Sequence, residues 1–84
     1  MATAARQLQR PMARRTRIEH ELDLVRGAIA MVTAGEARRV SLVVRNGAML
    51  LPTAQAEGRQ RGVIVRALWH PGRAECDLIV EPIG

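Results

Sequence analysis

The sequence predicts a single small α/β (α+β) domain with the element order α-β-α-β-β. Three observations predict it: an apolar stripe with helical spacing, alternating β-branched segments further along the chain, and turn dipeptides between those segments. The chain has 84 residues, enough for one domain. We expect a three-stranded mixed sheet, in which a right-handed β-α-β unit is followed by a C-terminal hairpin.

The first predicted helix covers residues 17–34. Thr16 and Glu19 have the spacing of a capping box, in which the two residues bind each other's backbone amides at the start of a helix. Gly35 follows, where a helix commonly ends in the left-handed conformation. The apolar stripe between them repeats at intervals of four and three residues: Ile18, Leu22, Val25, Ile29 and Val32.

Residues 39–45 alternate between two faces and predict the first strand, which Asn46-Gly47 ends. A short second helix is predicted over residues 51–61, with Pro52 in its first turn. Gly62 ends this helix, because glycine is poor in a helix interior and frequent just after one.

The second and third strands are predicted at residues 63–70 and 76–81. Pro71-Gly72 between them has the signature of a type II turn. The order of elements resembles that of the Alba proteins and of the C-terminal domain of translation initiation factor three, without their first strand. A shared order of elements does not by itself imply a shared function.

The net charge of +5 is confined to the start of the chain. Residues 1–17 hold five arginines and no acidic residue, whereas residues 18–84 hold eight arginines and eight acidic residues. We therefore divide the chain into a basic, flexible arm over residues 1–16 and a domain over residues 17–84. Arginine neutralises phosphate, so the candidate nucleic-acid contacts are Arg6, Arg10, Arg14, Arg15 and Arg17. The alternative is a solvated tail without a partner.

A second candidate site lies at the carboxyl ends of the first two strands. If these strands are parallel, their carboxyl ends meet at the edge where open α/β sheets bind ligands. Backbone amides at a helix N-terminus favour an anion there. The candidate ligand-binding residues are Arg45, Asn46, Gly47, Trp69 and His70. The alternative is that Asn46-Gly47 simply forms a turn.

The single cysteine, Cys76, excludes an internal disulfide. If residues 71–75 form the hairpin loop, His70 and Cys76 face each other, and a Cys–His pair is the minimum for an activated thiolate. A buried structural cysteine is the alternative that free cysteines favour. No spacing resembles a metal cage, so we predict no catalytic residue, metal or cofactor.

These features predict a non-catalytic binding or interaction module that contacts nucleic acid or a ribonucleoprotein through its arm. A small-ligand-binding or enzymatic module at the strand ends is the alternative. Two helices cover both faces of strands that are apolar on both sides only thinly, or one face well. The second arrangement leaves an apolar sheet face for a partner, so we expect a homodimer. The chain has neither a membrane-length apolar run nor a secretory signal, which predicts a cytoplasmic protein without membrane contact.

Overall fold

The computed structural model describes the backbone of residues 2–84 and the side chains of residues 17–84. The described chain forms two helices and one three-stranded sheet, which confirms a small α+β domain. The elements are α1 (Ala2–Thr33), β1 (Val40–Val44), α2 (Gly47–Gln60), β2 (Val63–Trp69) and β3 (Cys76–Pro82).

The topology of the sheet differs from the prediction. The strand order is β1-β3-β2, and β3 pairs antiparallel with both neighbours. The predicted mixed sheet with β1 and β2 as parallel neighbours is therefore wrong. The physical reason lies in β3, whose segment Leu78–Val80 is buried on both faces of the sheet. A strand that is apolar on both faces takes the central position, where it also forms the predicted hairpin with β2.

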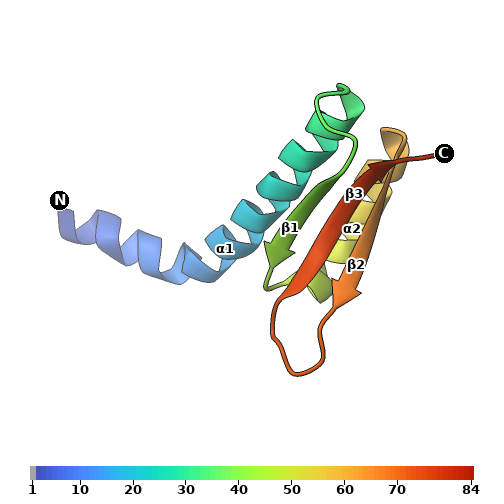
Figure 1. The fold of residues 1–84 in the computed structure, drawn as a ribbon. Helices are drawn as coiled ribbons and strands as arrows, with labels where there is room; N and C mark the ends of the chain where they lie inside the picture. The colour runs from blue at the N-terminus through green and yellow to red at the C-terminus, as the bar shows by residue number, and fades with distance from the viewer. Residues whose placement is uncertain (1) are drawn as a thin grey trace.

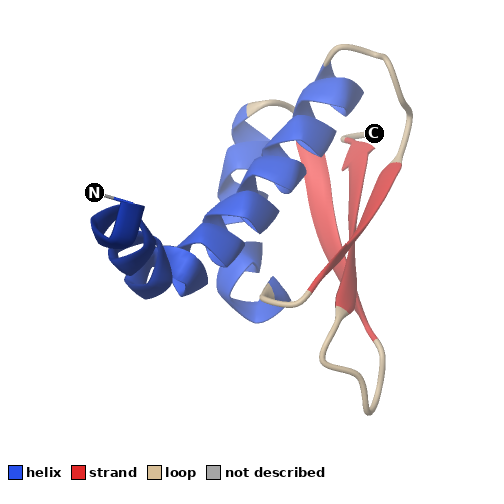
Figure 2. Cartoon of the chain, turned by 90° about the vertical axis from the view of Figure 1, so that its left-hand side faces the viewer, coloured by secondary structure: helices blue, strands red, loops and turns tan. Residues whose placement is uncertain are grey.

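Both helices cover the same face of the sheet, and the other face is open (Figure 2). Burial alternates along β2: Val63 and Val65 are buried under the helices, whereas Ile64 and Arg66 are exposed on the open face. α1 packs on β1 and β3, and α2 packs mainly on β2. The core between helices and sheet is aliphatic, with its largest fully buried side chains at Ile29, Leu78, Val25, Val44, Val63 and Val80.

Helix α1 begins at Ala2, so the predicted start at residue 17 is wrong. Thr16 and Glu19 lie inside the helix and do not form a capping box at its start. The reason is composition, because residues 2–15 are rich in alanine, arginine and glutamine, which are strong helix formers. The N-terminal part of α1 extends away from the sheet (Figure 1). That residues 1–16 act as a separate flexible arm stays a prediction.

The C-terminal end of α1 is as expected. The helix ends at Thr33, and Gly35 has a φ of 78°, a conformation that glycine adopts without strain. The Gly35 N–H donates to the Val32 carbonyl at 3.1 Å, and the Glu36 N–H donates to the Met31 carbonyl at 2.9 Å. These bonds satisfy the last helix carbonyls.

Helix α2 begins at Gly47 rather than at residue 51. Pro52 is therefore inside the helix and not in its first turn. The earlier start follows from packing, because the helix buries a face of small and apolar residues: Gly47, Leu50, Ala54 and Gly58. Burial of that face outweighs the low helix propensity of its two glycines.

Candidate binding site where α1, β1 and α2 meet

The Glu21 carboxylate joins α1 to the segment between β1 and α2. The Arg45 backbone N–H donates to Glu21 Oε2 at 2.7 Å, and the Asn46 backbone N–H donates to Oε1 at 3.0 Å. The Asn46 side-chain amide donates to the same Oε1 at 2.8 Å. The amides that were expected to bind an external anion are therefore occupied by an anion of the protein itself.

The surroundings of Glu21 stabilise its charged form. Burial alone would raise the pKa of Glu21, but the hydrogen bonds from Arg45 and Asn46 and the positive charge of Arg45 outweigh burial and lower that pKa. Glu21 is therefore ionised at neutral pH. Its charge-assisted bonds fix where α1 lies along β1.

A hollow of about 450 Å³ is lined in part by Arg45 and Asn46, the two residues that Glu21 binds. Arg17 and Arg45 bring two cations to it, from α1 and from the end of β1. Among the side chains that the structure describes, neither of these arginines forms an ion pair. The other lining residues are Ile18, Asn46 and Met49. Two guanidinium groups beside apolar side chains suit a phosphate or carboxylate that carries an apolar group.

The hollow joins parts of the two predicted sites. Arg17 belongs to the predicted nucleic-acid set, whereas Arg45 and Asn46 belong to the predicted ligand set. Glu21 and Met49 were not predicted from the sequence. A signal existed for Glu21, because it lies three residues after Ile18 and one before Leu22, on the edge of the apolar stripe.

Gly47 and Trp69 lie together on the helix-covered side of the sheet. A Cβ atom added to Gly47 would lie 3.4 Å from Trp69 Cη2 and 3.5 Å from Val44 Cγ2, and it would collide with Cys76 Sγ. Close approach between α2 and the sheet therefore requires glycine at this position. Trp69 is half exposed at the end of β2, beside this contact.

His70 does not join this site, and it does not face Cys76. The register of the hairpin pairs Trp69 with Cys76, so the predicted loop of residues 71–75 was one residue too short. His70 Nε2 lies 3.2 Å from Asp77 Oδ2. Adjacent residues of a strand point to opposite faces, which separates the His70 ring from Trp69 and from the thiol.

Cys76 is a buried structural residue in the described structure. Its exposed fraction is 1%. Burial raises the pKa of the Cys76 thiol, and the charges of Asp77 and Glu21 raise that pKa further. A thiol with a raised pKa is a weak nucleophile at neutral pH.

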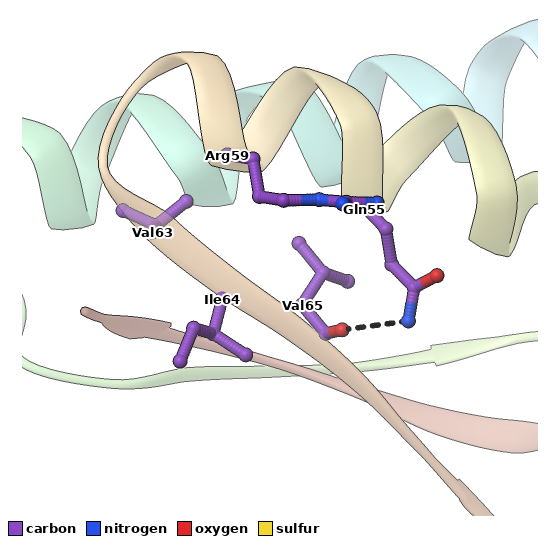
Figure 3. A pocket seen from close by; sticks show the side chains of 5 residues that line it. All are labelled: Gln55, Arg59, Val63, Ile64 and Val65. Atoms are coloured by element: carbon purple, nitrogen blue, oxygen red, sulfur yellow. Dashed lines mark hydrogen bonds between the residues drawn. The ribbon is translucent and has the colours of Figure 1, made fainter.

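The other edge of the sheet holds a second hollow, of about 210 Å³, lined by Gln55, Arg59, Val63, Ile64 and Val65 (Figure 3). The Gln55 side-chain amide donates to the backbone carbonyl of Val65 at 3.3 Å. This bond occupies a backbone acceptor at the outer edge of β2.

The chain matches no known protein family model, no curated protein and no solved structure. Within the described residues, no three His, Cys, Asp or Glu side chains gather where they could hold a metal ion. No helix in the described part of the chain has both the length and the apolar character needed to cross a membrane.

Proposed function

We propose that this protein is a non-catalytic binding module that contacts the phosphates of a nucleic acid through the N-terminal part of α1. One observation carries the proposal: the whole net charge of +5 belongs to residues 1–17, and residues 18–84 are neutral. A segment of this kind attracts a polyanion and releases its counterions.

The helical conformation of residues 2–17 adds to this support. Along the N-terminal part of α1, Arg6, Arg10 and Arg14 follow each other at intervals of four residues, which places these backbone positions on one side. α1 bends between this part and the part that covers the sheet (Figure 1). Arg15 is on another side of the helix. A four-residue interval corresponds to about 6 Å along the helix axis. One side of this part of the helix therefore carries a row of three arginine positions.

The hollow continues this row onto the body of the protein. Arg17 follows the row in the chain and lines the hollow together with Arg45. Trp69 is the only aromatic residue, so stacking of successive bases on aromatic rings contributes little. We therefore expect binding that depends on charge and tolerates changes in nucleic-acid sequence.

The test measures the affinity of the full-length chain for duplex DNA as a function of salt concentration. We expect a log–log slope of up to about −4. Arg10→Ala removes one charge from the row and should flatten the slope by roughly 0.9. Arg15→Ala removes the same charge from another side of α1 and should flatten it by less than half as much. Arg59→Ala, at the far end of α2, should leave it unchanged.

Two results would contradict the proposal. The first is that Arg10→Ala and Arg15→Ala flatten the salt-dependence slope equally. This result would show that the nucleic acid does not bind to one particular side of α1. The second is an affinity that is independent of salt.

A second candidate function is the binding of a small amphipathic anion in the hollow itself. It is favoured by the apolar residues Ile18 and Met49 beside the two arginines. Titration with octanoate, followed by NMR, should then shift the signals of these residues, and Arg45→Ala should abolish the shift. Inorganic phosphate alone should bind more weakly, because it lacks the apolar chain.

A further inference from the structure

The outer edge of β1 is an unprotected strand edge. β1 pairs only with β3, and no other strand of the described structure lies beside it. Its sequence, Val-Ser-Leu-Val-Val, contains no charge and no proline. Proteins usually protect such edges with charges, prolines or a covering element, because the free backbone groups pair readily with another strand.

The backbone groups on this edge follow from the pairing of the strands. The Val65 carbonyl points away from β3, toward Gln55. Val80, which is paired with Val65, therefore turns its own backbone groups toward Val40 on β1. The alternation along β1 then leaves the N–H and C=O groups of Ser41 and Val43 on the outer edge.

An exposed apolar flank of α1 lies on the same side of the molecule. Leu24 and Met31 are 44% and 42% exposed, and Gly27 lies between them at intervals of three and four residues. This flank, Leu24–Gly27–Met31, faces away from α2, because Arg26 on the other side of α1 pairs with Glu57 of α2 at 2.8 Å. α1 covers β1, so the flank lies above the free edge.

Within the described part of the chain, neither a close contact nor the backbone conformation requires glycine at position 27. Its φ is not positive, and a Cβ atom added there would meet nothing within 4 Å. Glycine inside a helix lowers the stability of the helix relative to alanine. A glycine between two exposed apolar side chains instead allows the backbone of another element to approach closely.

The Leu24–Gly27–Met31 flank and the middle of β1 are at the same height, measured along the direction of the strand. The bonds of Glu21 to Arg45 and Asn46 fix where α1 lies along β1. Leu42, the middle of β1, is about 10 Å back along the strand from Arg45. The same distance along α1 is about seven residues, which reaches from Glu21 to the neighbourhood of Gly27.

We propose that a second copy of this chain binds here through a two-fold axis beside Leu42 and Gly27. The β1 strands of the two copies pair antiparallel, and the two α1 helices pack antiparallel across Gly27. A two-fold interface brings each patch against itself, so it pairs a free strand edge with a free strand edge and an apolar flank with an apolar flank.

The charges along α1 fit this antiparallel arrangement. Arg17 at one end of the flank comes near the C-terminal end of the partner copy's helix. That end carries the negative end of the helix dipole, and Glu36 follows it in the chain. The opposite, parallel arrangement would bring the two Arg17 side chains together.

The test is sedimentation velocity of the nuclease-treated, full-length protein between 1 and about 200 µM, a range that covers weak and stable dimers. We expect a concentration-dependent dimer. Gly27→Glu should raise the dimer dissociation constant at least tenfold. Its thermal midpoint, measured at a concentration where the protein is monomeric, should not fall. Ala56→Glu adds the same charge at an exposed position of α2, away from the flank, and should leave association unchanged.

A second variant tests the strand edge separately. Val43→Lys places a charge on β1 at a side chain that is 66% exposed, so it should weaken the dimer without unfolding the protomer. In the wild-type protein, the amides of Ser41 and Val43 should exchange hydrogen more slowly as the concentration rises.

Three results would overturn the proposal. One is a wild-type monomer throughout the concentration range. Another is a dimer that persists in both Gly27→Glu and Val43→Lys. The third is a dimer that is disrupted only by Leu68→Lys, because Leu68 is on the open face of the sheet. All of these measurements are made without nucleic acid, so they are independent of the proposed function.

Discussion

The two edges of the sheet are covered in different ways. At β2, α2 packs so closely that a Cβ atom on Gly58 would lie 3.0 Å from Val65 Cγ2 and 3.2 Å from the Val63 carbonyl. Gln55 also occupies a backbone carbonyl of that strand. At β1, the edge is open, and a Cβ atom added to Gly27 in the helix above it would have no described atom within 4 Å. The protomer covers part of the β2 edge by itself and leaves the β1 edge open.

This contrast shows how the same residue type serves opposite purposes in two helices. Gly58 is buried because α2 must approach β2, whereas Gly27 is exposed on a flank that no part of the described protomer covers. For a chain of 84 residues with an aliphatic core, burial gained by association adds to a core of limited size.

The largest effect is expected in β3, the central strand, which pairs with both edge strands. Leu78 is fully buried in β3, under both helices. Leu78→Ala removes packing from both sides of the core and should lower the free energy of unfolding by about 2–5 kcal/mol. Urea denaturation followed by circular dichroism and by Trp69 fluorescence measures it. Two separate unfolding transitions would contradict this prediction, because they would show that the two edges of the sheet do not unfold as one unit.

A smaller effect is expected from Glu21, which ties α1 to the β1 end of the sheet. Glu21→Gln keeps the shape of the side chain but brings an NH₂ group against N–H donors. We expect a loss of roughly 1.5–3 kcal/mol at neutral pH, typical of hydrogen bonds to a charged group. Thermal unfolding at pH 7 measures it. No comparable carboxylate holds the β2 edge among the described residues.

The pH dependence of this effect has a definite sign. The folded state lowers the pKa of Glu21, so its contribution is complete above the unfolded value near 4.5 and is lost as pH falls through the folded value. The pKa of Glu57 is also lowered, by its hydrogen bond to Arg26. Glu57→Gln is therefore the matched control, and it should change the acid profile less, because its ion pair is exposed.

The sequence predicted the elements better than their arrangement. The strands were expected within one or two residues of where they lie, because alternation and turn dipeptides are local signals. The position of β3 between β1 and β2 depends on competition among three apolar strands, which no local signal resolves. The His70–Cys76 pairing failed for a related reason, because a one-residue difference in loop length moves a side chain to the other face.

Some residues of the candidate site were predictable from the sequence, but their arrangement was not. Arg17, Arg45 and Asn46 were expected to bind ligands, but as members of two separate sites. Their meeting at one hollow depends on the register between α1 and β1, which the Glu21 bonds fix. The start of α1 at Ala2 was missed, because the capping-box spacing outweighed the helix propensity of the preceding residues.

The two glycines should respond to alanine with opposite signs. Gly27→Ala places a methyl group in open space and should stabilise the protomer by up to about 1 kcal/mol. Gly58→Ala gains the same helix propensity, but its methyl group would lie only 3.2 Å from the Val63 carbonyl oxygen. This oxygen belongs to the backbone and cannot easily move. We expect a net loss of about 1 kcal/mol. Urea unfolding of both variants at low protein concentration measures these changes in the free energy of unfolding. Changes of the same sign in both variants would contradict the proposed difference between the edges.

The smallest effect is expected at the hydrogen bond that covers β2. Gln55→Ala removes the donor to the Val65 carbonyl and leaves that acceptor to water, because the strand is at the edge of the sheet. The expected loss is about 0.5–1 kcal/mol, typical of a neutral hydrogen bond with solvent access. Gln60→Ala makes the same substitution at an exposed position of α2 and controls for the change in helix propensity. The variant should also make the amides of β2 exchange hydrogen faster, because Gln55 no longer covers the strand. If Gln60→Ala costs as much as Gln55→Ala and leaves β2 exchange equally changed, then the packing of α2 alone protects this edge, and the side-chain bond contributes nothing to the difference from β1.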